Sequence, residues 1–149
     1  NEILDFISSD HSPASPAIKE IESGNLKKAW GGVAGLQFLL PASWTALKEN
    51  ISLEEFIPLI TSQPAKFINE KNRGEIKPGN YADLVIWDPD EKSKVSEEDI
   101  LFSHKISPYV GEELFGTIRQ TIVNGETVFQ EGRIINKNKG KWLLRKQEK

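Results

Sequence analysis

The stretch TIRQTIVNGETVF, residues 117–129, decides the fold of the second half of this 149-residue chain. Two runs rich in β-branched residues flank Asn124 and Gly125. A two-residue hairpin turn needs positive φ at both turn positions, and Asn-Gly adopts that conformation more readily than most pairs. The sequence therefore predicts an antiparallel hairpin, and Gly132 predicts a further turn before Ile134 and Ile135.

Upstream of the hairpin, the character of the sequence changes at about residue 72. Gly and Pro punctuate residues 72–79, which predicts a turn at the Pro-Gly pair. The run ADLVIW, residues 82–87, favours a strand, and we expect Asp88 and Pro89 to stop it. Asp83 is interpreted as a turn or strand-edge residue. Residues 72–149 therefore form the β-rich half of the chain.

The first 71 residues carry helical patterns after one short strand. The apolar run at residues 3–7 predicts a buried strand, and the prolines at positions 13 and 16 predict a loop after it. A first helix is predicted from apolar residues spaced by three and four positions. Those residues are Val33, Leu36, Leu40, Trp44 and Leu47. A capping box, Ser52 to Glu55, predicts the start of a second helix, and Pro64 lies near the start of a third.

Composition excludes several classes of protein. The formal net charge of -3 argues against a nucleic-acid partner, which normally needs a basic face. No apolar run reaches the roughly 20 residues needed to cross a bilayer, so we expect no membrane partner. The absence of cysteine excludes disulfides and thiolate metal sites, and it favours an intracellular, cytoplasmic location.

Asp10 is the first candidate for chemistry because it follows the predicted strand. Catalytic groups of (β/α)8 barrels lie at the carboxyl ends of strands. A lone Asp-His pair before a proline is also typical of a turn, and that structural interpretation stays open. His11 could ligate a metal instead. Neighbours on a strand point to opposite faces, so only one of Asp10 and His11 would face a site, and the pattern does not decide which.

Several motifs resemble the cyclic amidohydrolase family, and within it the allantoinases. Those in the first half are SDHSP at residues 9–13, LKKAWGG at 26–32 and GLQ at 35–37. Those in the second half are GEIKPGNYADLVIWDP at 74–89, HKISPY at 104–109 and VNG at 123–125, and they resemble the family's small β domain. The resemblance covers nearly the whole chain in matching order. The Ala-Trp-Gly-Gly stretch favours allantoinases over hydantoinases, dihydropyrimidinases and dihydroorotases.

This resemblance implies an α/β fold. Residues 1–71 would be the last strand and helices of a metal-dependent (β/α)8 barrel, and residues 72–149 the strands and tail of a small β-sandwich domain. It implies that Asp10 ends the eighth barrel strand and ligates the more exposed of two divalent metals, which we expect to be zinc. Two metals lower the pKa of a bridging water. A carboxylate beside that water can take its proton and return it to the departing nitrogen, so Asp10 is expected to be catalytic as well.

The resemblance also implies the substrate-binding residues. In relatives, the residue before the Gly-Gly pair contacts a cyclic ureide through main-chain groups, which points to Trp30 and Gly31. Glycine allows the backbone to approach a ligand closely. The alternative, a helix-entry turn with Trp30 in the core, stays open. Ser12 is a second candidate for a hydrogen bond to the ureide, although an ordinary loop serine fits its position equally well.

Most of the family's metal ligands are missing from this chain. They are a His-x-His pair, a carboxylated lysine and two further histidines, whereas the chain has only His11 and His104. We therefore expect a piece of a longer hydrolase, inactive by itself, with the other ligands encoded upstream. The implied function of the whole protein is hydrolysis of the hydantoin ring of allantoin to allantoate, in purine catabolism, by a homodimer or homotetramer.

Two alternatives remain. The first is a hydantoinase or dihydropyrimidinase that acts on another cyclic amide, and comparing hydrolysis of allantoin with that of dihydrouracil would separate the two. The second is a non-catalytic relative that keeps the barrel and the β domain as an assembly scaffold. Retention of Asp10 speaks against a scaffold.

Overall fold

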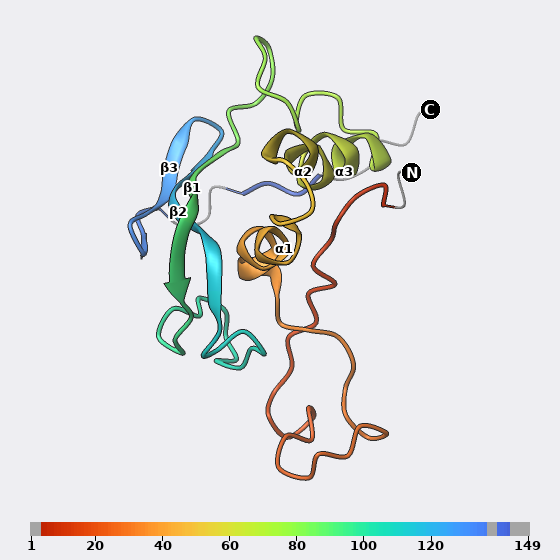
Figure 1. Cartoon of the computed structure of the whole chain (residues 1–149). Coiled ribbons are helices and arrows are strands. Elements are labelled where there is room, and N and C mark those ends of the chain that lie inside the picture. The colour runs from red at the N-terminus through yellow and green to blue at the C-terminus, as the bar shows by residue number, and fades with distance from the viewer. Residues whose placement is uncertain (1–3, 137–139, 144–149) are drawn as a thin grey trace.

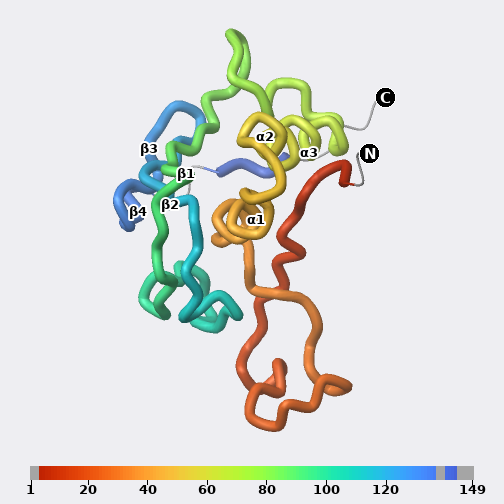
Figure 2. Tube along the Cα trace, in the orientation of Figure 1, coloured from red at the N-terminus to blue at the C-terminus, as the bar shows by residue number. Residues whose placement is uncertain are grey.

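The computed structural model describes residues 4–136 and 140–143. The helices are the 3-10 helix η1 (Leu36–Phe38), α1 (Leu39–Leu47), α2 (Leu53–Ile60) and α3 (Ser62–Phe67). The strands are β1 (Leu84–Lys94), β2 (Glu113–Val123), β3 (Glu126–Gln130) and β4 (Arg133–Ile134). The helices lie beside the sheet, and the red-orange segment that precedes them extends away from both as a long loop (Figures 1 and 2).

The four strands form one antiparallel sheet in the order β1-β2-β3-β4. The predicted hairpin is confirmed, because β2 and β3 are joined by Asn124 and Gly125 with φ of 51° and 80°. The predicted second turn is confirmed as well. Glu131 and Gly132, with φ of 44° and 78°, connect β3 to β4. Both turns use the left-handed region that glycine adopts without strain.

Strand β1 is longer than its sequence predicts. It continues through Asp88 and Pro89 to Lys94, so the expectation that these residues stop the strand is wrong. The pairing with β2 is interrupted between Ile86 and Trp87 and again between Asp88 and Lys92. A proline cannot donate to a strand ladder, and an irregular section of the pairing is one of the few places within a strand where it fits.

Local signals place the helices where the sequence predicts them. The capping box of α2 is confirmed: Ser52 N donates to Glu55 Oε2 at 2.8 Å, and Glu55 N donates to Ser52 Oγ at 3.3 Å. These hydrogen bonds, the one involving the Ser52 backbone foremost, lower the pKa of the Glu55 carboxyl. The apolar spacing from Val33 to Leu47 is realised as η1 followed by α1.

The helices and the sheet share one core. Trp44 of α1 is buried, its ring centroid is 5.1 Å from that of Phe56, and its ring meets Trp87 of β1 edge-on at 6.0 Å. Trp44 Nε1 donates to the carbonyl of Pro89 at 2.9 Å. A second link comes from β2, where Phe115 N donates to Thr45 Oγ1 at 2.8 Å. These contacts join α1 to both long strands.

The predicted strand at residues 3–7 is not present in its described part, residues 4–7, and that prediction is wrong there. Ile3 lies outside the described residues. A strand needs a neighbouring strand that exchanges hydrogen bonds with it. In the described ranges, the main chain of residues 4–7 makes one hydrogen bond to another main-chain group, from Ile7 N to the carbonyl of Leu59 at 2.9 Å. Leu59 lies in a helix, α2, so this bond is not part of a sheet. Residues 4–136 and 140–143 hold a single sheet, so the closed barrel and the sandwich implied for the whole protein stay predictions.

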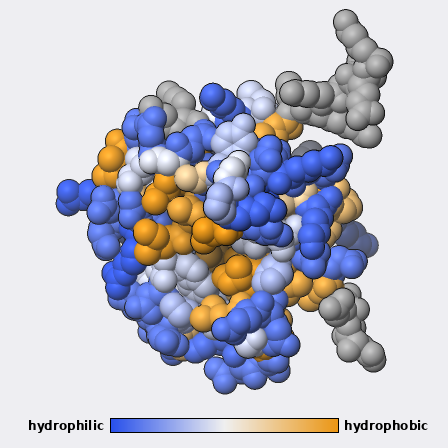
Figure 3. All heavy atoms as spheres, turned by 90° about the horizontal axis from the view of Figure 1, so that it is seen from above, coloured by the Kyte–Doolittle hydropathy of each residue, from blue (hydrophilic) through white to orange (hydrophobic). Residues whose placement is uncertain are grey.

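Much apolar surface lies at the outside of the molecule. Figure 3 shows apolar side chains gathered in the middle of the face seen from above. Over the whole described surface, Phe67, Ile68 and Ile76 are 73%, 61% and 90% exposed. Of the large side chains in the described ranges, only Phe56 and Ile100 are fully buried. No helix in these ranges is long and apolar enough to cross a bilayer.

Candidate functional site

Asp10 begins a short turn in the N-terminal segment, which the Ser12 side chain closes. Its φ of 44° is unusual for a residue other than glycine, although aspartate tolerates it better than most. Ser12 Oγ donates to the Asp10 carbonyl at 3.0 Å and fixes this turn. The side chain of Asp10 is exposed, and within the described residues no hydrogen bond or ion pair uses its carboxylate. The carboxylate is therefore available to a ligand.

The segment around Asp10 lies beside the Gly-Gly motif. Ser12 N donates to the carbonyl of Val33 at 2.9 Å, within an isolated parallel bridge between His11 and Val33. Gly32 has a φ of 75°, and a Cβ at this position would overlap the Cβ and Oγ of Ser12. The structure thus brings together the two motifs that the sequence singles out, and it does so through close packing that only glycine allows.

His11 is engaged in packing rather than free. Its Nδ1 accepts a hydrogen bond from Leu36 N at 3.2 Å, and its ring meets Phe102 edge-on with centroids 5.3 Å apart. The hydrogen bond holds the imidazole at the start of η1, and the ring contact holds it against Phe102. Since one side chain of the Asp10–His11 pair is used structurally and the other is free, the arrangement favours Asp10 as the reactive member.

Trp30 does not lie in the core, so the alternative interpretation as a buried helix-entry residue is wrong. Its side chain is 60% exposed. Its main chain is held instead: Trp30 N donates to the carbonyl of Ile18 at 2.9 Å. Lys19 Nζ donates to the carbonyls of Trp30, Gly31 and Gly32 at 3.2, 3.0 and 2.7 Å. Sequence reasoning missed Lys19, because no pattern separates it from Lys27 and Lys28 in the same polar stretch.

The described residues do not form a complete metal site. Among the described residues, no group of three or more His, Cys, Asp or Glu side chains could hold a metal ion. A free carboxylate is a suitable oxygen ligand for zinc or another divalent ion. Asp10 therefore fits the role of a single ligand.

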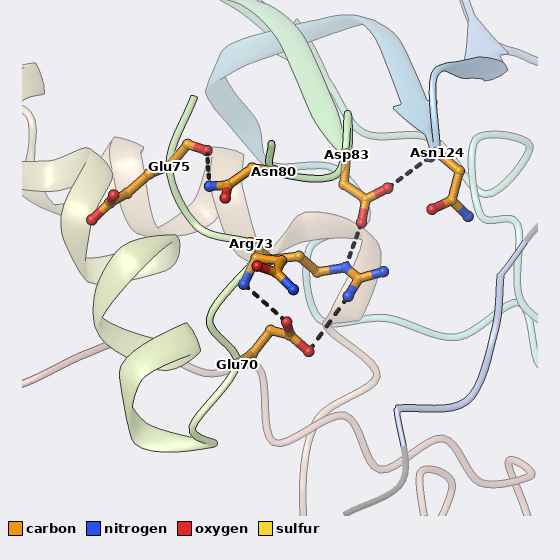
Figure 4. A network of polar contacts seen from close by, with 7 residues as sticks. Glu70, Arg73, Glu75, Asn80, Asp83 and Asn124 are labelled. Atoms are coloured by element: carbon orange, nitrogen blue, oxygen red, sulfur yellow. Dashed lines mark hydrogen bonds and ion pairs between the residues drawn. The ribbon is translucent and has the colours of Figure 1, made fainter. Parts of the chain in front are cut away.

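A second polar cluster, shown in Figure 4, is structural. Asp83 lies one residue before β1, in line with its predicted place at a strand edge. Arg73 Nε donates to Asp83 Oδ2 at 2.7 Å, and Asp83 Oδ1 accepts from Asn124 N at 2.7 Å. Arg73 also pairs with Glu70 at 3.4 Å and stacks over Tyr81. Partial burial raises the pKa of Asp83, but the Asn124 amide and the Arg73 guanidinium outweigh it and lower the pKa overall.

Comparison with known proteins gives the family. Residues 7–129 match the model of the amidohydrolase family. The chain belongs to this family. The match includes both Asp10 and the β2–β3 hairpin, so a single family relationship covers the candidate site and most of the sheet.

Curated relatives of this amidohydrolase are allantoinases. The chain is 40% identical over 133 residues to allantoinase of Arabidopsis thaliana, covering 87% of the chain and 26% of the relative. It is 37% identical over 146 residues to allantoinase of Rubrobacter xylanophilus, covering 97% of the chain and 32% of that relative. The resemblance to allantoinases is thus confirmed. The chain spans between a quarter and a third of the length of these relatives.

Solved structures of hydantoinases share the fold. L-hydantoinase from Arthrobacter aurescens superposes with a TM-score of 0.80 at 30% identity, covering 89% of this chain and 30% of that one. D-hydantoinase from Thermus sp. superposes with a TM-score of 0.81 at 19% identity, covering 91% of this chain and 30% of that one, and this shows the fold alone.

Proposed function

We propose that this chain is part of an allantoinase, which hydrolyses the amide bond of the hydantoin ring of allantoin and gives allantoate in purine catabolism. The observation that carries the proposal is the similarity to allantoinases, at 36% to 40% identity over 87% to 97% of the chain. The similar hydantoinase structures reach 30% identity.

In this proposal Asp10 is the proton carrier. Its carboxylate has no partner among the described residues and stands at a fixed, exposed turn. It would take a proton from the water that attacks the ring carbonyl carbon. As the carbon–nitrogen bond breaks, the same carboxylate would return that proton to the departing nitrogen. An amide in place of the carboxylate could not accept the proton.

Asp10 would also hold one of two divalent metal ions, zinc in our proposal. Such ions lower the pKa of water, so that hydroxide is available near neutral pH. The remaining ligands would come from residues outside this chain, which covers 26% of the Arabidopsis relative. We expect the 149 residues alone to be inactive, and their exposed apolar side chains fit packing against the rest of a (β/α)8 barrel. For the whole protein we propose a homodimer or homotetramer.

The substrate would lie against the Trp30–Gly31 main chain. This segment is next to the Asp10 turn, because Gly32 packs on Ser12. The Ser12 hydroxyl donates to the Asp10 carbonyl, and its oxygen keeps acceptor capacity for a ureide N–H. The cyclic ureide would therefore contact main-chain groups on one side and the Asp10 carboxylate on another.

The test is turnover by the full-length protein. We expect hydrolysis of allantoin with a kcat/KM at least about tenfold above those for hydantoin and dihydrouracil, a difference of about 1.4 kcal/mol in transition-state binding. Preference for dihydrouracil would instead establish the alternative, a dihydropyrimidinase or hydantoinase, which the superposition on L-hydantoinase at a TM-score of 0.80 favours. No hydrolysis of any cyclic amide by the metal-loaded protein would point to the scaffold.

A further inference from the structure

A single ammonium group holds the Trp30–Gly32 main chain from one side. Lys19 Nζ donates to three consecutive carbonyls at 3.2, 3.0 and 2.7 Å. The Lys19 side chain is half-buried, and no carboxylate of the described residues forms an ion pair with it. An ammonium has three N–H donors, so these carbonyls satisfy it completely.

This arrangement determines where the peptide N–H groups of the loop point. In a trans peptide the C=O and the N–H are directed oppositely, and the described residues contain no cis peptide. The carbonyl of Trp30 shares a peptide group with the N–H of Gly31, and the carbonyl of Gly31 shares one with the N–H of Gly32. Since both oxygens face Lys19, the two N–H groups face away from it.

The same two N–H groups have no acceptor within the described part of the chain. A cation on the oxygen side polarises a peptide group, which makes its N–H a stronger donor. A Cβ on Gly32 would overlap Ser12 and lie 3.6 Å from the carbonyl oxygen of Asp10, so the donors lie close to the Asp10 main chain. Two adjacent, polarised and unpaired donors suit the carbonyl oxygen of a bound molecule, which accepts hydrogen bonds in the ground state as well.

We propose that Lys19 is a positioning residue for substrate binding. It fixes the Trp30–Gly32 main chain so that the amides of Gly31 and Gly32 donate to a carbonyl oxygen of a cyclic ureide. Lys19 itself touches no substrate atom and acts through the loop. The ureide part of this inference rests on the proposed function.

The experiment compares three variants of the full-length protein: Lys19→Met, Lys19→Arg and the control Lys28→Met. Lys28 lies in the same loop, is exposed, and its Nζ has no partner among the described residues. The measurements are kcat and KM for allantoin, and hydrogen–deuterium exchange of the peptide that contains residues 29–33. Removing Lys19 or Lys28 changes the net charge equally, so charge alone cannot separate the two methionine variants.

We expect Lys19→Met to raise KM about tenfold or more with kcat within about threefold, because the amides bind ground state and transition state alike. Exchange at residues 29–33 should become faster. Lys19→Arg keeps the charge and several donors, so its KM and its exchange rate at residues 29–33 should lie between those of the wild type and Lys19→Met. Lys28→Met should match the wild type.

An unchanged KM in Lys19→Met overturns the proposal, even if thermal stability falls, and so does an equal rise in KM in the control. If the wild type prefers another cyclic amide, the KM comparison is made with that substrate. If the wild type hydrolyses none, the proposed function and the ureide role both fail. Hydrogen exchange then decides separately whether Lys19 holds the loop.

Discussion

Two aspartates of this chain, Asp10 and Asp83, sit in loops that are built in opposite ways. The loop before β1 is closed by side chains, since the Asp83 carboxylate binds both Arg73 and the Asn124 amide. In the loop from Asp10 to Gly32, the side chains of Ser12 and Lys19 bind main-chain carbonyls, and no carboxylate takes part in these contacts. The first arrangement uses its carboxylate internally. The second leaves its carboxylate free, and this difference supports our proposal that Asp83 is structural and Asp10 is reactive.

The largest effect should come from replacing the free carboxylate. Asp10→Asn in the full-length protein keeps the size of the side chain but removes the proton acceptor. We expect kcat to fall by roughly 10³-fold, within the range of general acid–base catalysis, while the unfolding free energy stays within about 0.5 kcal/mol. Steady-state kinetics and denaturant unfolding measure the two quantities. Asp5→Asn is the matched control, because Asp5 is exposed in the same segment. Retained turnover in Asp10→Asn would refute the assignment.

A second test concerns the packing that places Asp10. Gly32→Ala puts a Cβ into Ser12 at a φ of 75°, whereas Gly24→Ala adds one in open space at a φ of 61°. Both variants meet backbone strain of about 1 kcal/mol, but only the first also displaces the Asp10 turn. We expect kcat/KM to fall about 100-fold for Gly32→Ala and less than about threefold for Gly24→Ala. Equal losses of kcat/KM in the two variants would mean that backbone strain, and not the contact with Ser12, lowers the activity.

Replacing Asp83 should lower stability without lowering kcat, the reverse of the result expected for Asp10→Asn. Asp83→Asn removes the charge that Arg73 binds, and we expect a loss of about 1 kcal/mol in local stability with kcat unchanged. Native-state hydrogen exchange of the Asn124 amide measures the loss. A fall in kcat comparable to that of Asp10→Asn would remove the contrast between the two loops.

The stability that the Asp83 carboxylate contributes should depend on pH. The folded state lowers the pKa of Asp83 below its ordinary value of 3.8, so the unfolded state binds the proton more readily. The contribution to stability is therefore complete above the ordinary value and is lost as pH falls through the lowered one. Wild type and Asp83→Asn should differ at pH 6 and converge at low pH.

What the sequence predicted correctly was encoded locally. The Asn124-Gly125 hairpin and the Ser52–Glu55 capping box each depend on a few adjacent residues, and both are present. The predicted stop at Asp88 and Pro89 is wrong, because the irregular pairing that tolerates this proline depends on the register with β2. The strand expected at residues 3–7 needs neighbouring strands, and none lies beside its described part.

In the candidate site, too, features encoded by adjacent residues are predicted from the sequence, and features that depend on distant residues are not. Motifs in the sequence predict Asp10 and Trp30 as candidates, but no motif indicates Lys19, which binds the carbonyls of the loop. Lys19 lies 11 to 13 positions from the carbonyls it binds, and a lysine in a polar stretch gives no signal at that separation. Contacts between a side chain and a distant part of the main chain leave no trace in local residue patterns, so only the three-dimensional arrangement reveals them.

The smallest effect should come from the most local feature. Ser52→Ala removes the side chain that caps α2 and should cost about 1 kcal/mol. Ser62→Ala is the control, because Ser62 begins α3 without a side-chain capping bond. Hydrogen exchange of the amides of residues 53–57 should speed up only in Ser52→Ala, with kcat/KM unchanged in both variants. If Ser52→Ala lowered kcat/KM as much as Gly32→Ala, general loosening of the fold would explain the loss of activity. Activity would then depend on the stability of the fold, and not on the Ser12 and Lys19 contacts in the loop from Asp10 to Gly32.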